Sequence, residues 1–265
     1  MTWDPEQYLA YQDLRLRPAL ELLGRVPNER AEVVVDLGCG PGNVTPWLAG
    51  RWPDAEVIGV DDSAEMLARA RRDHPGLETT WVQHEAATWE PDRPVDVIFS
   101  NALLHWLDEH ERLVPRLLDL LVPGRGTLAF QVPDNYREPS HREAYALARD
   151  PRWADRLVPL LRERPILAPQ AYARLLAPLV SHLDVWTTTY LQPMQGRDPV
   201  AEWTRGSLLR PLLAELTDEE AAAFDAGYRE RLRAAYPSEP DGTTWFPFTR
   251  LFVVATRSTR GNAPT

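Results

Sequence analysis

The sequence predicts an α/β fold in which helices cover both faces of a mainly parallel sheet. Along the first half of the chain, apolar runs of strand length alternate with stretches of helical periodicity. A glycine-rich turn separates the first of these runs from the helix after it. Hydrophobic residues make up 44% of the 265 residues, which is enough to build a core. Such an alternation is typical of βαβ units.

The first half of the chain supplies a helix and then five strands joined by helices. Ser63 is a good N-cap for one of these helices. Pro115 either lies near the true start of another helix or kinks it. We expect helices at about residues 6–23, 43–52, 63–72 and 109–121, and strands at about 32–36, 56–61, 79–83, 95–100 and 126–132.

The second half changes pattern, with helical stretches at 138–178 and 199–235 and strands at 183–190 and 250–256. The sheet would then have about seven strands, and the two helical segments would lie together as a lid. We assign residues 1–135, 180–193 and 248–257 to the sheet domain, and residues 136–179 and 194–247 to helical inserts that form the lid.

Composition excludes several classes of function. The net charge of −10 disfavours a nucleic-acid binder, and all 29 basic residues are arginine, which excludes lysine chemistry. No apolar run is long enough to span a membrane, and residues 1–10 do not resemble a secretion signal. The lone Cys39 excludes an internal disulfide and a cysteine-rich zinc site. We expect a monomeric cytoplasmic protein without a metal.

The glycine turn is the strongest local signal. Gly38, Gly40 and Gly42 follow a strand and precede a helix, in a G-x-G-x-G spacing rather than the G-x-G-x-x-G of nicotinamide-binding folds. Asp36 stands two positions before the first glycine. S-adenosylmethionine has no phosphate and carries an ammonium group, which Asp36 could help neutralise. The turn therefore favours S-adenosylmethionine over a dinucleotide.

Further polar groups are expected at the same edge of the sheet. Asp61 ends the second strand, 19 residues after Gly42, close to the distance at which an acid meets ribose hydroxyls. Glu85 is a candidate for the adenine amino group, and the N–H of Ala86 for the adjacent ring nitrogen. Three other residues are candidates for contacts with the cofactor: Asn43, Tyr8 and Arg17. The last two could instead touch the substrate or only pack.

Several segments outside the glycine turn resemble one family. They are Trp3-Asp4-Pro5 with Tyr8-Leu9, Arg17-Pro18, Ser100-Asn101-Ala102 with His105-Trp106, residues 131–135, Glu202-Trp203 with Leu209-Arg210-Pro211, and residues 250–255. With the turn at 36–43, they are similar to class I methyltransferases of the trans-aconitate 2-methyltransferase family. The resemblance implies a Rossmann-like seven-stranded sheet whose last strand is antiparallel, and places Asn101 near the cofactor.

The resemblance also implies methyl transfer from S-adenosylmethionine to a carboxylate of trans-aconitate or a related small polycarboxylic acid. A carboxylate is already ionised at pH 7, so no catalytic base is required. The protein would act by positioning and electrostatics, with arginines holding the polyanion. The expected substrate-binding residues are His105, Trp106, Asn135, Tyr136, Arg210 and Arg250.

Other functions remain open at this stage. The chain could methylate a hydroxyl or an amine of another small molecule, with His105 as general base. It could also be a cofactor-binding module that regulates a partner without catalysis. A nicotinamide oxidoreductase is disfavoured by the glycine spacing.

Overall fold

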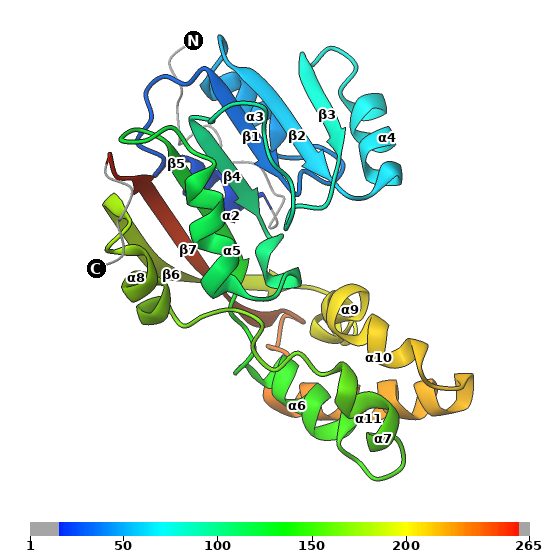
Figure 1. The fold of residues 1–265 in the computed structure, drawn as a ribbon. Helices are drawn as coiled ribbons and strands as arrows, with labels where there is room; N and C mark the ends of the chain where they lie inside the picture. Colours follow the sequence, from blue (N-terminus) through cyan, green and yellow to red (C-terminus); the bar gives the residue numbers. More distant parts are fainter. Residues whose placement is uncertain (1–15, 260–265) are drawn as a thin grey trace. The chain divides into compact units, whose positions relative to one another are not determined.

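A computed structural model describes residues 16–259 of the chain, and Figure 1 shows its elements. The strands form one seven-stranded sheet in the order β3-β2-β1-β4-β5-β7-β6, and its last strand is antiparallel. The predicted Rossmann-like α/β fold is therefore confirmed. The strands are β1 (Val33–Leu37), β2 (Glu56–Asp61), β3 (Thr79–Gln83), β4 (Val97–Asn101), β5 (Thr127–Pro133), β6 (Val180–Met194) and β7 (Thr244–Arg257).

The order of the strands determines where in the sheet the expected cofactor site lies. Strand β1 lies between β2 and β4 and pairs in parallel with both, so Asp36 lies opposite Gly59 on one side and Phe99 on the other. All five residues of β1 are buried, as expected for a central strand of a parallel sheet. The carboxyl ends of β1, β2, β3 and β4 therefore meet at one edge of the sheet.

The chain divides into two compact units. Unit 1 contains residues 1–133, 166–187 and 251–265, and unit 2 contains residues 134–165 and 188–250. The helices of unit 1 are α2 (Arg17–Leu23), α3 (Thr45–Arg51), α4 (Ala64–Asp73), η1 (Leu104–Trp106), α5 (His110–Asp119) and α8 (Pro169–Leu176).

Local sequence explains several helix boundaries in unit 1. The Ser63 hydroxyl accepts the backbone N–H of Met66 at 3.3 Å, so it caps α4 as predicted. Helix α5 begins at His110 and contains Pro115 in its interior. Of the two alternatives for Pro115, a position near the true start of the helix is therefore wrong.

Residues 134–135, 188–193 and 248–250, which the sequence assigned to the sheet domain, fall in unit 2. The division also differs at residues 166–179, which the sequence assigned to a helical insert. The structure places them in unit 1, where Tyr172 of α8 is fully buried. The hydroxyl of Tyr172 is hydrogen-bonded to the ring of His110, and its ring packs edge-on against Phe130 at 5.4 Å. Burial of this aromatic ring fixes α8 there, a long-range contact that helical periodicity does not reveal.

Unit 2 has a hydrophobic core of its own, which includes the fully buried Phe224 and Tyr228. The Tyr228 hydroxyl donates to the backbone oxygen of Ser140 at 2.8 Å, which joins the two helical segments. The two helical segments of unit 2 therefore pack together. The elements are α6 (Pro139–Ala148), α7 (Ala154–Leu157), η2 (Val158–Leu160), α9 (Pro199–Thr204), the π-helical turn η3 (Arg205–Leu209), α10 (Arg210–Ala214) and α11 (Asp218–Ala235).

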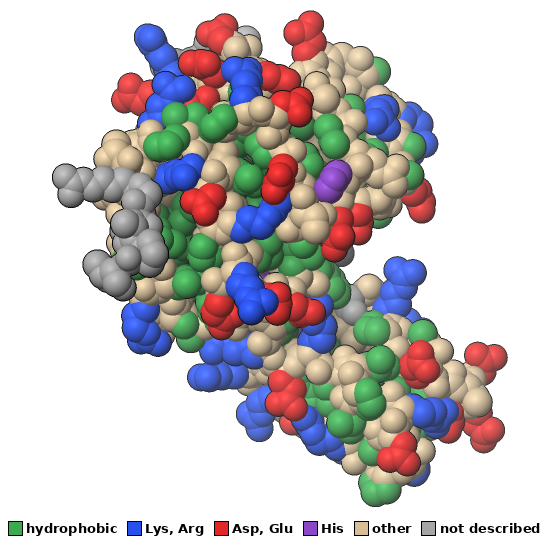
Figure 2. Space-filling view, in the orientation of Figure 1, with side chains coloured by type: hydrophobic (Ala, Val, Ile, Leu, Met, Phe, Trp, Pro, Cys, Tyr) green, Lys and Arg blue, Asp and Glu red, His purple; other side chains and the backbone are tan. Residues whose placement is uncertain are grey.

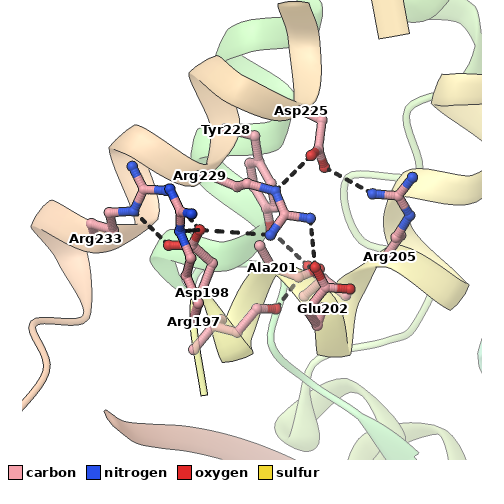
Figure 3. Close-up of polar contacts among 11 residues, drawn as sticks. Arg197, Asp198, Ala201, Glu202, Arg205, Asp225, Tyr228, Arg229 and Arg233 are labelled. Atoms are coloured by element: carbon pink, nitrogen blue, oxygen red, sulfur yellow. Dashed lines mark hydrogen bonds and ion pairs between the residues drawn. The ribbon is translucent and has the colours of Figure 1, made fainter. Parts of the chain in front are cut away.

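Ion pairs connect α9 and α11 within unit 2 (Figure 3). The Arg233 guanidinium meets both oxygens of Asp198, with Nη2 at 2.6 Å from Oδ2, and holds the pKa of Asp198 below its usual range. Arg229 pairs with Asp225 and Glu202, each at 2.6 Å. Because the Asp198 carboxylate is only 5% exposed, these pairs are shielded from solvent more than ordinary surface pairs.

Charges of both signs are mixed on the face of the molecule that Figure 2 shows. Several pairs join distant segments, for example Arg156 to Glu220 at 2.6 Å. Among residues 16–259, no helix combines the length and the apolar composition that a membrane crossing would need.

Candidate functional site

The glycine turn joins the end of β1 to the start of α3. The backbone N–H groups of Gly38 and Cys39 donate to the Val60 oxygen at 2.8 and 3.0 Å, so the turn is fastened to β2. Gly40 has a φ of +54°, and a Cβ atom built on it would meet nothing within 4 Å. Its backbone therefore faces open space, which a ligand could approach closely.

Gly42 has a different reason to be glycine. Its φ is +80°, and a Cβ atom there would lie 2.9 Å from the Trp81 ring and 3.0 Å from the His74 ring. The missing side chain lets Trp81 of β3 and His74 pack against the turn. In the structure Gly42 thus shapes the turn by packing.

Asp61 connects the turn to the end of β2. Its Oδ2 accepts the Gly40 N–H at 2.8 Å and its Oδ1 accepts the Ser63 N–H at 3.0 Å. These two bonds fix the orientation of a half-buried carboxylate. A carboxylate offers about four lone pairs. The two bonds therefore leave acceptor capacity for hydroxyl groups of a ligand.

Asp36 lies beneath the turn, with only 1% of its surface exposed. Its Oδ2 accepts the hydroxyl of Thr45, the first residue of α3, at 2.7 Å. Burial raises the pKa of Asp36 to about 7, and the nearby charge of Asp61 acts in the same direction. The Thr45 hydrogen bond opposes the shift, because it favours the ionised form. A cationic group placed beside Asp36 would remove much of this cost.

We expect Asp36 to make the ligand-free protein less stable as the pH rises. A carboxyl group whose pKa is raised by folding contributes its full stabilisation below the unfolded value near 4, and loses it as pH rises through about 7. The shift corresponds to about 4 kcal/mol in the free energy of unfolding. Denaturant unfolding between pH 4 and 8 should show Asp36→Asn gaining stability relative to the wild type as pH increases. A constant difference between the two proteins would contradict the shifted pKa.

The other residues expected near the cofactor lie along the same edge of unit 1. Glu85 is exposed and Ala86 is buried in the turn after β3, where the Trp89 N–H donates to the Glu85 oxygen at 2.9 Å. Asn101 ends β4, and its Oδ1 accepts the side-chain amide of Gln131. Asn43 is exposed in the glycine turn and Arg17 is exposed at the start of α2. Tyr8 lies outside the described residues.

The expected substrate residues fall in both units. In unit 1, His105 and Trp106 belong to η1, with ring centroids 4.8 Å apart and Trp106 52% exposed. In unit 2, Arg210 is exposed at the first residue of α10, directly after η3. The described contacts do not join Arg210 to the other expected substrate residues of this unit.

Asn135, Tyr136 and Arg250 are brought together in unit 2. The Asn135 Oδ1 accepts the Thr249 N–H at 2.7 Å, next to Arg250 in the chain. Arg250 is 7% exposed, and its guanidinium carbon lies 4.6 Å from the Phe248 ring centroid. Its charge acts on the Tyr136 hydroxyl, whose pKa is raised above its ordinary value mainly by burial.

Asn135 has an unused donor. The residue is completely buried, and its Nδ2 has no hydrogen-bond partner among the described residues. Because Oδ1 is held by Thr249, the amide is fixed with its N–H₂ group directed elsewhere. A buried donor without a partner is costly, and an anionic ligand would satisfy it.

Sequence reasoning missed three members of this neighbourhood. His141 has its ring 5.3 Å from that of Tyr136, and burial lowers its pKa to about 4. The Tyr145 hydroxyl donates to the backbone oxygen of Arg162 at 2.7 Å, and the charge of Arg162 acts on Tyr136. The only signal was that Arg162 lies between Pro159 and Pro165. That signal does not distinguish it among 29 arginines.

No group of three or more histidine, cysteine, aspartate or glutamate side chains within residues 16–259 could hold a metal ion. Cys39 is buried, and burial together with the charges of Asp36 and Asp61 raises the pKa of its thiol. A thiol in such surroundings is a weak nucleophile.

Comparison with known proteins gives consistent matches. The model of the methyltransferase domain family matches residues 34–124. The trans-aconitate 2-methyltransferase of Azoarcus sp. is 49% identical over 97% of this chain and 99% of its own length. The corresponding proteins of Streptomyces avermitilis and Shigella dysenteriae are 48% and 41% identical, over 96% and 97% of this chain and 96% and 98% of their own lengths.

Solved structures agree at the level of the fold. The YcgJ protein of Bacillus subtilis superposes with a TM-score of 0.57 and 17% identity, over 92% of this chain and 100% of that one. A phosphoethanolamine N-methyltransferase of Haemonchus contortus, in complex with S-adenosylhomocysteine, gives 0.53 and 16%, over 91% of this chain and 53% of that one.

Proposed function

The chain belongs to the trans-aconitate 2-methyltransferase family, and we propose that it transfers a methyl group from S-adenosylmethionine to a carboxylate of trans-aconitate. The observation that carries the proposal is identity of 41–49% to relatives of this name along nearly the full length of each chain. The methyl ester of a polycarboxylic acid and S-adenosylhomocysteine would be the products.

Residues of unit 1 fit the cofactor. The open side of Gly40 admits a close approach of the nucleoside, and the oriented Asp61 carboxylate would accept its ribose hydroxyls. Asp36 would face the ammonium group, directly or through water, because ionised Asp36 is otherwise buried at a cost. The remaining proposed contacts to the cofactor are Tyr8, Arg17, Gly38, Gly42, Asn43, Glu85, Ala86 and Asn101.

Bound S-adenosylmethionine supplies an electrophilic methyl group on a sulfonium centre. The residues of the chain bind and orient the acid that accepts the methyl group. Arg250 would hold one carboxylate through two parallel N–H donors, and the Asn135 amide would donate to another oxygen. Tyr136, Arg210, His105 and Trp106 are proposed as further contacts.

The acceptor carboxylate is ionised at pH 7, so the protein need not remove a proton. Its contribution is to hold two reactants in line, which corresponds to roughly 7–11 kcal/mol of the barrier. The alternative of hydroxyl or amine methylation with His105 as base is not favoured, because the relatives are named for a polycarboxylate.

We also propose that the sheet domain and the helical segments of unit 2 bind different ligands. The sheet domain would bind the cofactor, and the helical segments of unit 2 would form the substrate lid. The lone, buried Cys39 is consistent with a cytoplasmic enzyme. We propose that the enzyme is a monomer, which light scattering on the purified protein would test.

Incubation of the purified protein with S-adenosylmethionine and trans-aconitate tests the function. We expect S-adenosylhomocysteine and a base-labile methyl ester in equal amounts, both identified by mass spectrometry. A parallel panel of related di- and tricarboxylic acids would rank the acceptors. Cofactor binding without turnover of any acid would reject the enzymatic proposal and favour a regulatory cofactor-binding module.

Cofactor binding should be coupled to ionisation of Asp36. If the ammonium group favours ionised Asp36, binding near pH 6.5 releases a proton, and affinity rises as the pH increases through about 7. Calorimetric titration with S-adenosylhomocysteine, which keeps the ammonium, in buffers of different ionisation enthalpy measures the protons released. Asp36→Asn should abolish the buffer dependence. Equal proton release by both proteins would contradict the role of Asp36.

A further inference from the structure

Unit 2 contains two further arginines, Arg162 and Arg164, in the segment 161–165, which has no regular secondary structure. The Arg164 guanidinium lies 3.4 Å from Oδ2 of Asp134. The charge of Arg162 acts on the hydroxyls of both Tyr136 and Tyr145 and opposes the rise of their pKa values.

The position of Arg162 is fixed by Tyr145 of α6. The Tyr145 hydroxyl donates to the Arg162 backbone oxygen at 2.7 Å, and Tyr145 is 7% exposed. Tyr145 also lies in an aromatic row, because its ring is 6.1 Å from that of His141, which in turn is 5.3 Å from Tyr136. The irregular segment is thereby fastened to a helix.

The two arginines of the segment act on different groups. Arg164 pairs with Asp134, whose backbone N–H donates to the Thr249 oxygen at 2.9 Å. Arg162 and Arg250 both act on the buried hydroxyl of Tyr136. Positive charge from two segments far apart in the sequence thus converges on one residue, beside the unused donor of Asn135.

We propose that Arg162 is a second carboxylate-binding arginine of the substrate site and determines specificity for a tricarboxylate. This inference rests on the proposed function. One carboxylate of trans-aconitate accepts the methyl group, so two more charges have to be neutralised in a half-buried site. Arg250 binds one of them and Arg162 binds the other, while the Tyr136 hydroxyl and the Asn135 amide donate between them. An acid that lacks the carboxylate held by Arg162 gains no binding free energy from this arginine.

A thermodynamic double cycle tests this assignment: one change replaces Arg162, and the other removes one carboxylate from the acid. The variant is Arg162→Gln, and the acids are trans-aconitate, cis-glutaconate and itaconate, each of the last two lacking one carboxylate. Dissociation constants are measured by calorimetry with S-adenosylhomocysteine bound, so that no reaction occurs. We expect trans-aconitate to bind about 10- to 100-fold more weakly to the variant. At least one dicarboxylate should lose less than about threefold.

Two further variants keep the result interpretable. Arg231→Gln removes an arginine of unit 2 that pairs with Glu143 at 3.4 Å, and it should leave all three affinities unchanged. Tyr145→Phe removes only the hydroxyl that positions Arg162, so it should weaken trans-aconitate binding in the same direction with a smaller effect. This variant carries the test if Arg162→Gln does not fold.

The outcomes separate the inference from the function. If the wild type methylates trans-aconitate but Arg162→Gln binds it as tightly as before, the inference is wrong and the function stands. An equal loss for all three acids also overturns it, because such a loss reports a general disturbance of the site. If the wild type methylates none of the acids, the proposed function fails first.

Discussion

Replacement of Asp61 by asparagine is expected to weaken S-adenosylhomocysteine binding by at least about 100-fold. The Asp61 oxygens accept the N–H groups of Gly40 and Ser63, so an amide would direct its N–H₂ group at one of these donors. The variant loses that bond and the charge that would attract the ribose hydroxyls. Hydrogen bonds to a charged group contribute about 1.5–3 kcal/mol each, so weakening of the proposed bonds to the two ribose hydroxyls accounts for the expected factor.

The neighbouring acid provides a matched control for this experiment. Asp62 is exposed, and its backbone oxygen accepts the Gln83 side-chain amide, a bond that Asp62→Asn retains. Calorimetric titration should therefore give a dissociation constant for Asp62→Asn close to that of the wild type. If Asp61→Asn also binds within threefold of the wild type, Asp61 does not hold the ribose, and the proposed cofactor site has to be revised.

The sequence was most informative where one short segment determines both structure and site. Strands β2 and β3 begin and end at the predicted residues, because apolar runs bounded by polar residues mark them clearly. The parallel pairing of β1 with β2 then brings Asp61 to Gly40. A contiguous motif and a regular sheet were sufficient to predict that these groups meet.

Strand ends that contain proline were harder to predict. Strand β6 extends to Met194 and β7 starts at Thr244, beyond the expected 183–190 and 250–256. The additional residues include Pro193 and Pro247, and proline is unfavourable in a strand because it has no N–H to donate. Strand β6 lies at the edge of the sheet, where a residue without an N–H is tolerated.

The proposed substrate site contains residues that the sequence did not reveal, and their contacts show why. Tyr145 and Arg162 are joined by a hydrogen bond across 17 positions, through a backbone oxygen in an irregular segment. No periodicity marks such a contact, and Arg162 has no local feature that separates it from other arginines. Arg250 was predicted through the resemblance to a family rather than from its physical setting.

Replacement of Arg250 by methionine is expected to lower kcat/KM for trans-aconitate by about 100- to 1000-fold. Methionine keeps an unbranched, apolar side chain against the Phe248 ring, so packing is largely preserved. The guanidinium, which would make a paired contact with a carboxylate, is lost. Removal of the cation proposed to hold one substrate carboxylate corresponds to about 3–4 kcal/mol in transition-state stabilisation.

Two measurements identify this loss as substrate binding rather than misfolding. Calorimetry with S-adenosylhomocysteine should give the same dissociation constant for Arg250→Met and the wild type, because the proposed cofactor contacts lie in unit 1. Arg197→Met, at a side chain that is 90% exposed in unit 2, serves as the control and should keep wild-type kcat/KM. If Arg250→Met retains kcat/KM within threefold, the tricarboxylate is held by other cations, and the buried arginine serves only the packing of β7.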